Sequence, residues 1–565
     1  MMVDVFVSYS AEDRLEVERV VSALERRGLS VWWDQRIEEH EWGPQIEENL
    51  SSARRVLAFI SQNAVNSKKY YIVAEMDRAL SENKLIPIQV GRFTQPLIFA
   101  GLTFGRQIYY FENFDDFIAD KRFLDICNLC KRDNIGTSVT PMRQTAAQWL
   151  DHRPGLSDIA LAFAVAAMET APLSIVLKGA ALLEQNLKEV LGQGIEDLGD
   201  NDGYRALLTP RRQRMDAIGA VIYHSAHRRY GEDVEHVRFV DPRRGLELFA
   251  YVWEELDLFR QPLVNWLEQL AEARGIRVRL RLGLMIGALA RVHFMAVFEA
   301  LISPWALQNN KCVRDVADVA LSVVAMDCGH KSTVAAIIKE WAHSNNEGAR
   351  RAAIEVSCGY TGFRYENLSI SILKTLAASS VGNVKMYEIM GDAVDFLFTE
   401  ISNADDNTLL DIGKLFEALA DWSEKAENEA VGMLPLYLFL RVMRHTPLMR
   451  KRETQGRFSL EDLVKDRFAI PTAQMFAISL RKFGDKDFSP RKEAQNIISM
   501  FMEKTKEINS SGSIEKTSDV LLKLVQNIYL RAGEQNDQHR ILFCVRSLYT
   551  EEDVRKIEYK AVLTS

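Results

Sequence analysis

The sequence predicts a doubly wound α/β domain followed by a large all-α region. Two observations indicate this division. Short apolar runs alternate with helix-like segments up to about residue 115, which is the order of a parallel sheet covered by helices. From Leu156 onward, apolar residues recur at helical spacing and the strand signal nearly disappears. A chain of 565 residues is also too long for one hydrophobic core.

Five strands are expected in the first part of the chain. The clearest is 56–60, a continuous apolar run typical of a parallel strand covered on both faces. Gly28 ends the first helix, as glycine commonly does, and Pro44 opens the second at a position that tolerates proline. The expected strands are 3–7, 29–33, 56–60, 85–90 and 107–111, and the expected helices are 15–24, 44–53, 70–81 and 114–130.

Four segments are expected along the chain. A stretch rich in glycine, threonine, serine and proline separates the α/β domain from the helices. Farther on, short polar turns join apolar-striped helices, which predicts stacked helix pairs of the HEAT-like type. An irregular helical domain is the alternative. The expected segments are the α/β domain at 1–132, a linker at 133–155, a helical domain at 156–310 and a HEAT-like repeat region at 311–565.

Composition and charge argue against several classes of function. The formal net charge is −8, so a general electrostatic attraction to nucleic acid is not expected. Charged residues and proline interrupt the most apolar stretches, which are therefore predicted to be core helices and not membrane spans. The first residues lack the basic and apolar regions of a signal peptide. Six cysteines in a chain of this length suit a reducing compartment, so we expect a cytoplasmic protein.

Three clusters of reactive or charged residues are weaker candidates for sites. Cys127 and Cys130 form a lone CxxC motif, which favours two thiols in a helix over a metal site. His224 and His227 lie about one turn apart but lack further ligands nearby. The basic run 210–214 is interpreted as a solvated face, with binding of an anionic ligand or nucleic acid as the alternative. No metal ion is expected.

The first strand ends in a polar turn, Ser8-Tyr9-Ser10, and a helix with acidic residues in its first turn follows. In parallel sheets, ligands bind at the carboxyl ends of the strands. The backbone N–H groups and hydroxyls of this turn are therefore candidates to line a ligand pocket. Ser8 and Ser10 are equally suited to cap the following helix, and the sequence leaves both interpretations open.

Three motifs in the first part of the chain resemble those of a TIR domain of bacterial type. They are DVFVSYSAEDR, then VWWDQRIEEHEWGPQIEENLSSARRVLAFIS, and then SKKYYIVAEMDRAL, in this order and at matching spacing. The resemblance covers roughly the first 115–130 residues and implies a flavodoxin-like fold with a five-stranded parallel sheet. TIR domains are either adapters that only assemble or enzymes that cleave NAD⁺ at its nicotinamide–ribose bond.

The resemblance implies that Glu75 is the catalytic residue, since the family carries a glutamate on this helix one turn after an aromatic residue. Tyr71 is that aromatic residue, where many members have tryptophan, and tyrosine can still stack on a ring. Glu75 lies about a right angle from the apolar stripe of the helix, at the edge of the packed face. A solvated helix glutamate is the alternative. The stripe consists of Ile72, Val73, Met76, Ala79 and Leu80.

The resemblance also implies the surroundings of Glu75. The loop 35–43 corresponds to the family's BB loop, which in enzymatic assemblies helps to close the site of a neighbouring protomer. Trp42 in this loop is expected to be an assembly contact, or else to pack against the following helix. The residues expected to bind substrate are Ser8, Tyr9, Ser10, Trp33, Asp34 and Tyr71, and those expected in the assembly loop are Glu41, Trp42 and Gly43.

A single carboxylate is sufficient for this chemistry. Ordinary glycosidases need two, because the leaving oxygen must be protonated. Nicotinamide in NAD⁺ carries a positive charge and leaves as a neutral molecule, so no general acid is required. One carboxylate can stabilise the oxocarbenium-like ribose and hydrogen-bond its hydroxyls.

The sequence is therefore interpreted as an NAD⁺ nucleosidase that oligomerisation through the helical region activates, in bacterial antiphage defence. NAD⁺ is its expected substrate and no cofactor is expected. A second copy of the chain and an activating trigger, such as a phage component, are the expected partners. Two alternatives remain open: an enzyme that makes a cyclic ADP-ribose-type messenger, and a non-catalytic TIR adapter.

Overall fold

The computed structural model of the chain divides into two compact units, Met1–Ala335 and Ala336–Ser565. The bounds of the four segments expected from the sequence remain predictions. The structure describes residues 3–33, 44–66, 71–82, 84–91, 97–103, 108–131, 145–169, 171–191, 209–226, 233–273, 275–325, 329–359, 368–380, 383–400, 406–426, 429–446, 466–482, 489–510 and 514–531, together with the single residues 93, 106, 460 and 538.

The first unit begins with a five-stranded parallel sheet in the order β2-β1-β3-β4-β5. This confirms the predicted flavodoxin-like α/β domain. In the register, Val5 lies between Val31 and Arg55. The strand order reverses between β1 and β3, because β2 lies on one side of β1 and the later strands lie on the other. Ligands bind at this point in such folds. The strands are β1 (Val5–Ser8), β2 (Val31–Trp33), β3 (Arg55–Ile60), β4 (Leu85–Val90) and β5 (Tyr109–Phe111).

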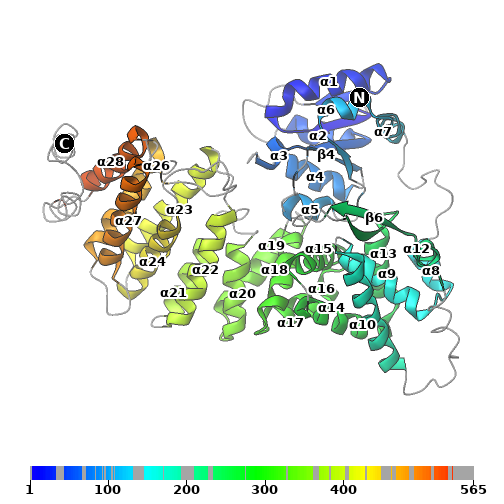
Figure 1. Ribbon diagram of the computed structural model, residues 1–565. Helices are drawn as coiled ribbons and strands as arrows, with labels where there is room; N and C mark the ends of the chain where they lie inside the picture. The colour runs from blue at the N-terminus through cyan, green and yellow to red at the C-terminus, as the bar shows by residue number, and fades with distance from the viewer. Residues whose placement is uncertain are drawn as a thin grey trace. The chain divides into compact units, whose positions relative to one another are not determined.

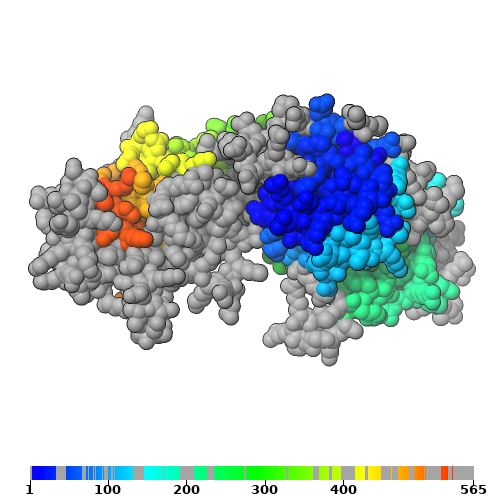
Figure 2. All heavy atoms as spheres, turned by 90° about the horizontal axis from the view of Figure 1, so that it is seen from above, coloured from blue at the N-terminus to red at the C-terminus, as the bar shows by residue number. Residues whose placement is uncertain are grey.

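Helices cover both faces of this sheet (Figure 1). Side chains alternate along each strand, so Val5 and Val7 pack on one face and Phe6 on the other. The domain forms a compact block of blue spheres in the space-filling view (Figure 2). The first face is covered by α1 (Arg14–Arg26), α6 (Phe114–Ala119) and α7 (Arg122–Cys130), and the second by α2 (Pro44–Ser52), α4 (Tyr71–Ser81) and α5 (Leu97–Thr103); η1 (Ala11–Asp13) and α3 (Gln62–Asn66) follow β1 and β3.

The segment predicted as one helix over 114–130 is two helices, α6 and α7, so that prediction was wrong at this point. Asp120 interrupts the helix in an extended conformation. Its carboxylate accepts a 2.8 Å hydrogen bond from the backbone N–H of Arg122 and a 2.7 Å bond from the Arg122 guanidinium. A local side-chain acceptor thus replaces the helical carbonyl.

Cys127 and Cys130 are residues of α7 that lie in the hydrophobic core. Burial raises the pKa of the Cys130 thiol to about 12, so the thiol stays protonated and unreactive. Among the described residues, no group of three or more possible ligands could hold a metal ion.

The rest of the first unit is mostly helical. The second half of the predicted linker contains helix α8 (Ala146–Asp151). A 2.8 Å hydrogen bond from Tyr251 to Asp151 holds α8 to helix α13 (Arg244–Glu255). The sequence did not predict the antiparallel hairpin β6–β7 that accompanies these helices. The elements are α8 (Ala146–Asp151), α9 (Leu156–Met168), α10 (Leu173–Leu191), α12 (Arg211–Ile218), β6 (Ala220–Ala226), β7 (Asp233–Phe239), α13 (Arg244–Glu255), α14 (Asp257–Ala273), α15 (Ile276–Val292), α16 (Phe294–Val297), η2 (Phe298–Ile302), α17 (Ser303–Ala306) and α18 (Lys311–Ala325).

The second unit is built of helices that pack on their near neighbours along the chain (Figure 1). Phe439 of α24 joins Phe416 of α23 and Phe476 of α26 through edge-to-face ring contacts of 5.0 Å. This confirms a large helical region, while the HEAT-like repeat remains a prediction. Helix α19 (Lys331–His343) contains the boundary of the units, and α20 (Glu347–Cys358), α21 (Leu368–Ser379), α22 (Val384–Glu400), α23 (Asp406–Lys425), α24 (Glu429–His445), α26 (Asp466–Arg481), α27 (Pro490–Ser510) and α28 (Ile514–Arg531) follow. No helix within the described ranges is long and apolar enough to cross a membrane.

Candidate functional site

Glu75 is buried on helix α4, with 8% of its surface exposed. The helix packs on β1, β3 and β4 through the apolar stripe that includes Ile72 and Met76. The burial of Glu75 argues against the alternative of a solvated helix glutamate. Since α4 begins near the carboxyl edge of the sheet, its second turn places Glu75 close to the edge where ligands bind in this fold.

Ser8 is on the same face of the sheet as α4. It ends β1 and follows Phe6 and Val7, so alternation directs its side chain to the face that Phe6 shares with α4. Ser8 is 1% exposed, and its Oγ has no hydrogen-bond partner among the described residues. A buried hydroxyl without a partner is costly, which makes Ser8 a candidate to hydrogen-bond a ligand.

Ser10 occupies the N-cap position of η1, yet its hydroxyl makes no capping bond to the backbone. It donates a hydrogen bond to the Glu12 carboxylate instead. The backbone carbonyl of Ser10 accepts from the N–H of Asp13 at 2.8 Å. Ser10 therefore fixes the turn after β1, in a position where it is 3% exposed.

Tyr9 and Trp33 face away from α4. Their rings lie 5.8 Å apart between centroids, within the hydrophobic core on the α1 face. The structure thus does not bring these two predicted substrate contacts together with Glu75. Trp32, which was not predicted as a site residue, lies on the α4 face and stacks on Phe6 with ring centroids 4.7 Å apart.

The remaining predicted residues add less. Tyr71 begins α4 one turn before Glu75, at the spacing the sequence indicated. Asp34 and the three residues of the assembly loop, Glu41, Trp42 and Gly43, lie outside the described residues. Their roles remain predictions.

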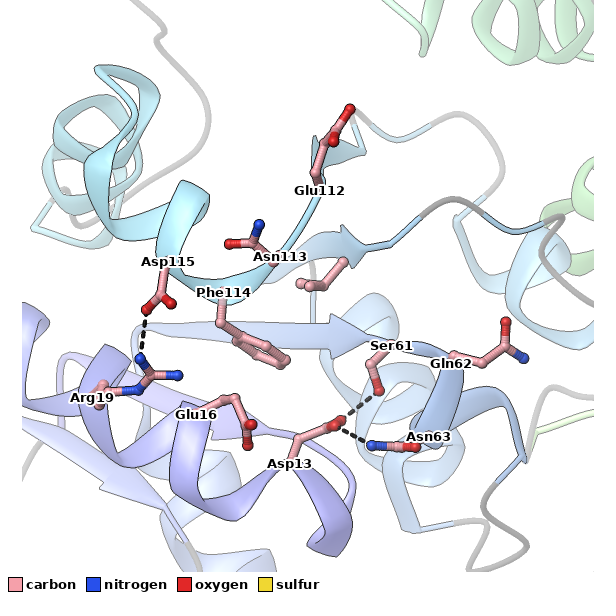
Figure 3. A pocket seen from close by; sticks show the side chains of 11 residues that line it. Asp13, Glu16, Arg19, Ser61, Gln62, Asn63, Glu112, Asn113, Phe114 and Asp115 are labelled. Carbon is pink, nitrogen blue, oxygen red and sulfur yellow. Dashed lines mark hydrogen bonds and ion pairs between the residues drawn. The ribbon is translucent and has the colours of Figure 1, made fainter.

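A separate cavity of about 350 Å³ opens at the carboxyl edge of the sheet on the α1 and α6 side (Figure 3). Asp13 is its most buried carboxylate; it accepts hydrogen bonds from Ser61 Oγ and, at 2.6 Å, from Asn63 Nδ2. Burial raises the pKa of Asp13, although both hydrogen bonds oppose this effect. The sequence did not identify Asp13 as a site residue, because its only signal was an acidic residue in the first turn of a helix.

The charge of this cavity is unsuited to a dinucleotide. Four carboxylates line it, and its one arginine, Arg19, is paired with Asp115 at 2.7 Å. The pyrophosphate of NAD⁺ would meet like charge there. Glu75 does not line this cavity, so the site implied by Glu75 and Ser8 on the opposite face is the better candidate for NAD⁺.

The basic cluster of the helical region is largely neutralised by neighbouring acids. Arg211 pairs with Glu235, and Arg214 lies 3.8 Å from Asp158. These pairs support the interpretation of a solvated face. His224 lies 3.9 Å from Glu235 on the exposed hairpin and is not part of a group of possible metal ligands in the described part of the chain.

A parallel sheet of this order with helices on both faces defines a flavodoxin-like domain, a fold in which ligands bind at the carboxyl edge of the sheet. Residues 5–124 match the family model of the TIR domain. The chain thus carries a TIR domain over about a fifth of its length, followed by a largely helical region. TIR domains include both NAD-cleaving enzymes and signalling adapters. A comparison with curated proteins found no match.

Proposed function

We propose that the TIR domain cleaves the nicotinamide–ribose bond of NAD⁺ with Glu75 as the catalytic carboxylate. The observation that carries this proposal is the burial of Glu75 on the face of the sheet that also holds the Ser8 hydroxyl, which has no hydrogen-bond partner within the described ranges. A buried carboxylate near the edge where ligands bind supports this role, because burying a charge is costly.

The reaction needs little from the protein beyond electrostatics and positioning. The C1′–N bond breaks, the bonding pair stays with nicotinamide, and nicotinamide leaves uncharged. Glu75 stabilises the positive charge that develops on the ribose, and its buried position strengthens that interaction. Water then adds at C1′ and releases one proton to the solvent. The Ser8 hydroxyl is proposed to hydrogen-bond the nicotinamide or the ribose.

The helical region is proposed to switch this activity on by bringing TIR domains together. A sensing and assembling platform accounts for the long helical part of the chain, in which neighbouring helices pack on one another. Depletion of NAD⁺ on assembly would stop an infected bacterial cell, in keeping with a role in antiphage defence. A phage component is the proposed class of trigger.

The test is nicotinamide release from NAD⁺ by the full chain over a wide range of protein concentration. We expect release that rises more steeply than linearly with concentration and falls at least a hundredfold in Glu75→Gln. Glu18→Gln is the matched control, because it removes the same charge from an exposed position on α1.

Equal release by wild type and Glu75→Gln would refute the assignment of Glu75. Absence of release at every concentration, combined with binding of a second TIR protein, would favour the adapter alternative. Analysis of the product distinguishes hydrolysis from cyclisation: ADP-ribose supports the nucleosidase, and a cyclic form supports the messenger-producing enzyme.

A further inference from the structure

Helix α4, which carries Glu75, also forms an ion pair with the helical part of the same unit. Arg291, at the end of α15, donates a 2.7 Å hydrogen bond from Nη2 to Oδ1 of Asp77. The two side chains are only 12% and 7% exposed. The partners are 214 residues apart in the chain, so this pair links the TIR domain to the helices that follow it.

Helix α15, which carries Arg291, packs closely on α18. Gly283 and Gly287 of α15 face α18, where an added Cβ would come within 2.5 Å of Val319 and Val323 respectively. Backbones that approach so closely leave little room for one helix to move against the other. Ala100 of the TIR helix α5 packs on the apolar surface of this pair.

Asp77 and Glu75 lie on opposite flanks of α4. Two residues correspond to roughly 200° around an α-helix, and the apolar stripe that faces the sheet lies between the two carboxylates. The sheet thus fixes the inner side of α4, and Arg291 holds one flank. A rotation of the helix about its axis would break the Asp77–Arg291 pair and move Glu75 by a similar angle.

The charge of Arg291 also acts on a second arginine, Arg106. Burial lowers the pKa of Arg106, and the charges of Arg243 and Arg291 lower it further. Asp241 accepts a 2.8 Å hydrogen bond from Arg243. Asp77 supplies the carboxylate that pairs with the largely buried Arg291 guanidinium, so its loss would remove this opposite charge and favour a shift of α4.

We propose that Arg291 is a positioning residue for Glu75 and acts through Asp77, so that the helical region sets the orientation of helix α4. This inference rests on the proposed function for its catalytic part. It makes the α15–α18 helix pair part of the TIR active-site scaffold, through which a change in the helical region reaches the chemistry.

The experiment combines amide hydrogen exchange at residues 71–81 of the full chain with steady-state nicotinamide release. In Arg291→Gln and Asp77→Asn we expect faster exchange in α4 and a tenfold to hundredfold fall in kcat, with KM for NAD⁺ changed by less than about threefold, because misplacement of a catalytic group acts on the chemical step. Arg291→Lys keeps the charge and should restore part of the slow exchange in α4 and part of kcat.

Arg211→Gln is the matched control. Arg211 is on α12 and pairs with Glu235 of β7, so this variant loses an arginine ion pair outside the α15–α18 pair. It should leave exchange in α4 and kcat unchanged.

Unchanged exchange in Arg291→Gln would overturn the inference whatever the activity. Faster exchange with unchanged kcat would overturn the positioning role, and a rise in kcat would show that the pair restrains the enzyme instead. A wild-type chain that releases no nicotinamide at any protein concentration and binds a second TIR protein would favour the adapter over the proposed function, and the exchange rates would still decide whether Arg291 holds α4.

Discussion

Asn63 donates a 2.6 Å hydrogen bond to the buried carboxylate of Asp13, and so joins helix α3, which follows β3, to η1 at the start of α1. Ser61 donates to the second oxygen of the same carboxylate. These bonds cross the edge of the sheet between β1 and β3, where the strand order reverses. Asp13 therefore fixes the geometry of this edge, at the cost of burying a charge.

The first prediction concerns the dependence of stability on pH. Burial raises the pKa of Asp13 in the folded state above its ordinary value of 3.8. The folded state then holds the proton more tightly than the unfolded state, so the stability contributed by protonated Asp13 is lost as pH rises through the folded-state pKa. Relative to Asp13→Asn, the wild type should lose stability as pH rises above 3.8 and through the folded-state pKa, as measured by denaturant unfolding of the full chain. A stability difference independent of pH would contradict this.

Ser8 provides a second prediction, which separates stability from function. Its hydroxyl is buried without a hydrogen-bond partner in the described part of the chain. Replacing it in Ser8→Ala should leave the free energy of unfolding unchanged or raise it by about 1 kcal/mol. If the hydroxyl contacts NAD⁺, kcat/KM should fall about tenfold in the same variant. Loss of stability with unchanged kcat/KM would show that Ser8 is structural.

For Trp33, in contrast to Ser8, we expect a loss of stability with little effect on substrate binding. It was predicted from the sequence to contact substrate, but it packs with Tyr9 on the α1 face of the sheet. Trp33→Phe should lower the free energy of unfolding by about 1 kcal/mol, because the smaller ring fills less of the core. The KM for NAD⁺ should stay within about twofold of the wild type. Substitution of Trp32, on the α4 face, is the comparison, and a larger KM effect at Trp33 than at Trp32 would contradict the assignment of faces.

The sequence was sufficient for features that depend on local patterns. Strand β4 is observed over the predicted residues, and the predicted apolar stripe of α4, including Ile72 and Met76, lies in the core. The break at Asp120 was missed, because one side chain that hydrogen-bonds the backbone does not disturb the apolar periodicity.

Features formed between distant segments could not be predicted. The hairpin β6–β7 has polar residues such as His224 and Glu235 along both strands, so its apolar alternation is weak. The side of the sheet on which Tyr9 and Trp33 lie depends on the register of each strand. That register is fixed by pairing within the sheet. The Asp77–Arg291 pair joins residues 214 positions apart and leaves no local signal.

The last prediction tests the packing of α15 on α18. A Cβ added at Gly287 would lie 2.5 Å from Cβ of Val323 and 2.8 Å from the carbonyl oxygen of Ala320, so the helices must separate to accept it. Gly287→Ala should therefore destabilise the chain by about 1–3 kcal/mol in denaturant unfolding, since a closely packed interface does not accept an extra methyl group without strain.

Gly275→Ala is the control for Gly287→Ala. Gly275 precedes α15, and an added Cβ there meets no atom within 4 Å. The control should change the free energy of unfolding by less than about 0.5 kcal/mol. Because Ala100 of the TIR helix α5 packs on the same helix pair, Gly287→Ala should also speed amide exchange in α5, whereas Gly275→Ala should not. Slow exchange in α5 of a destabilised Gly287→Ala chain would mean that α5 keeps its place without a rigid α15–α18 pair, and that this pair does not support the TIR domain.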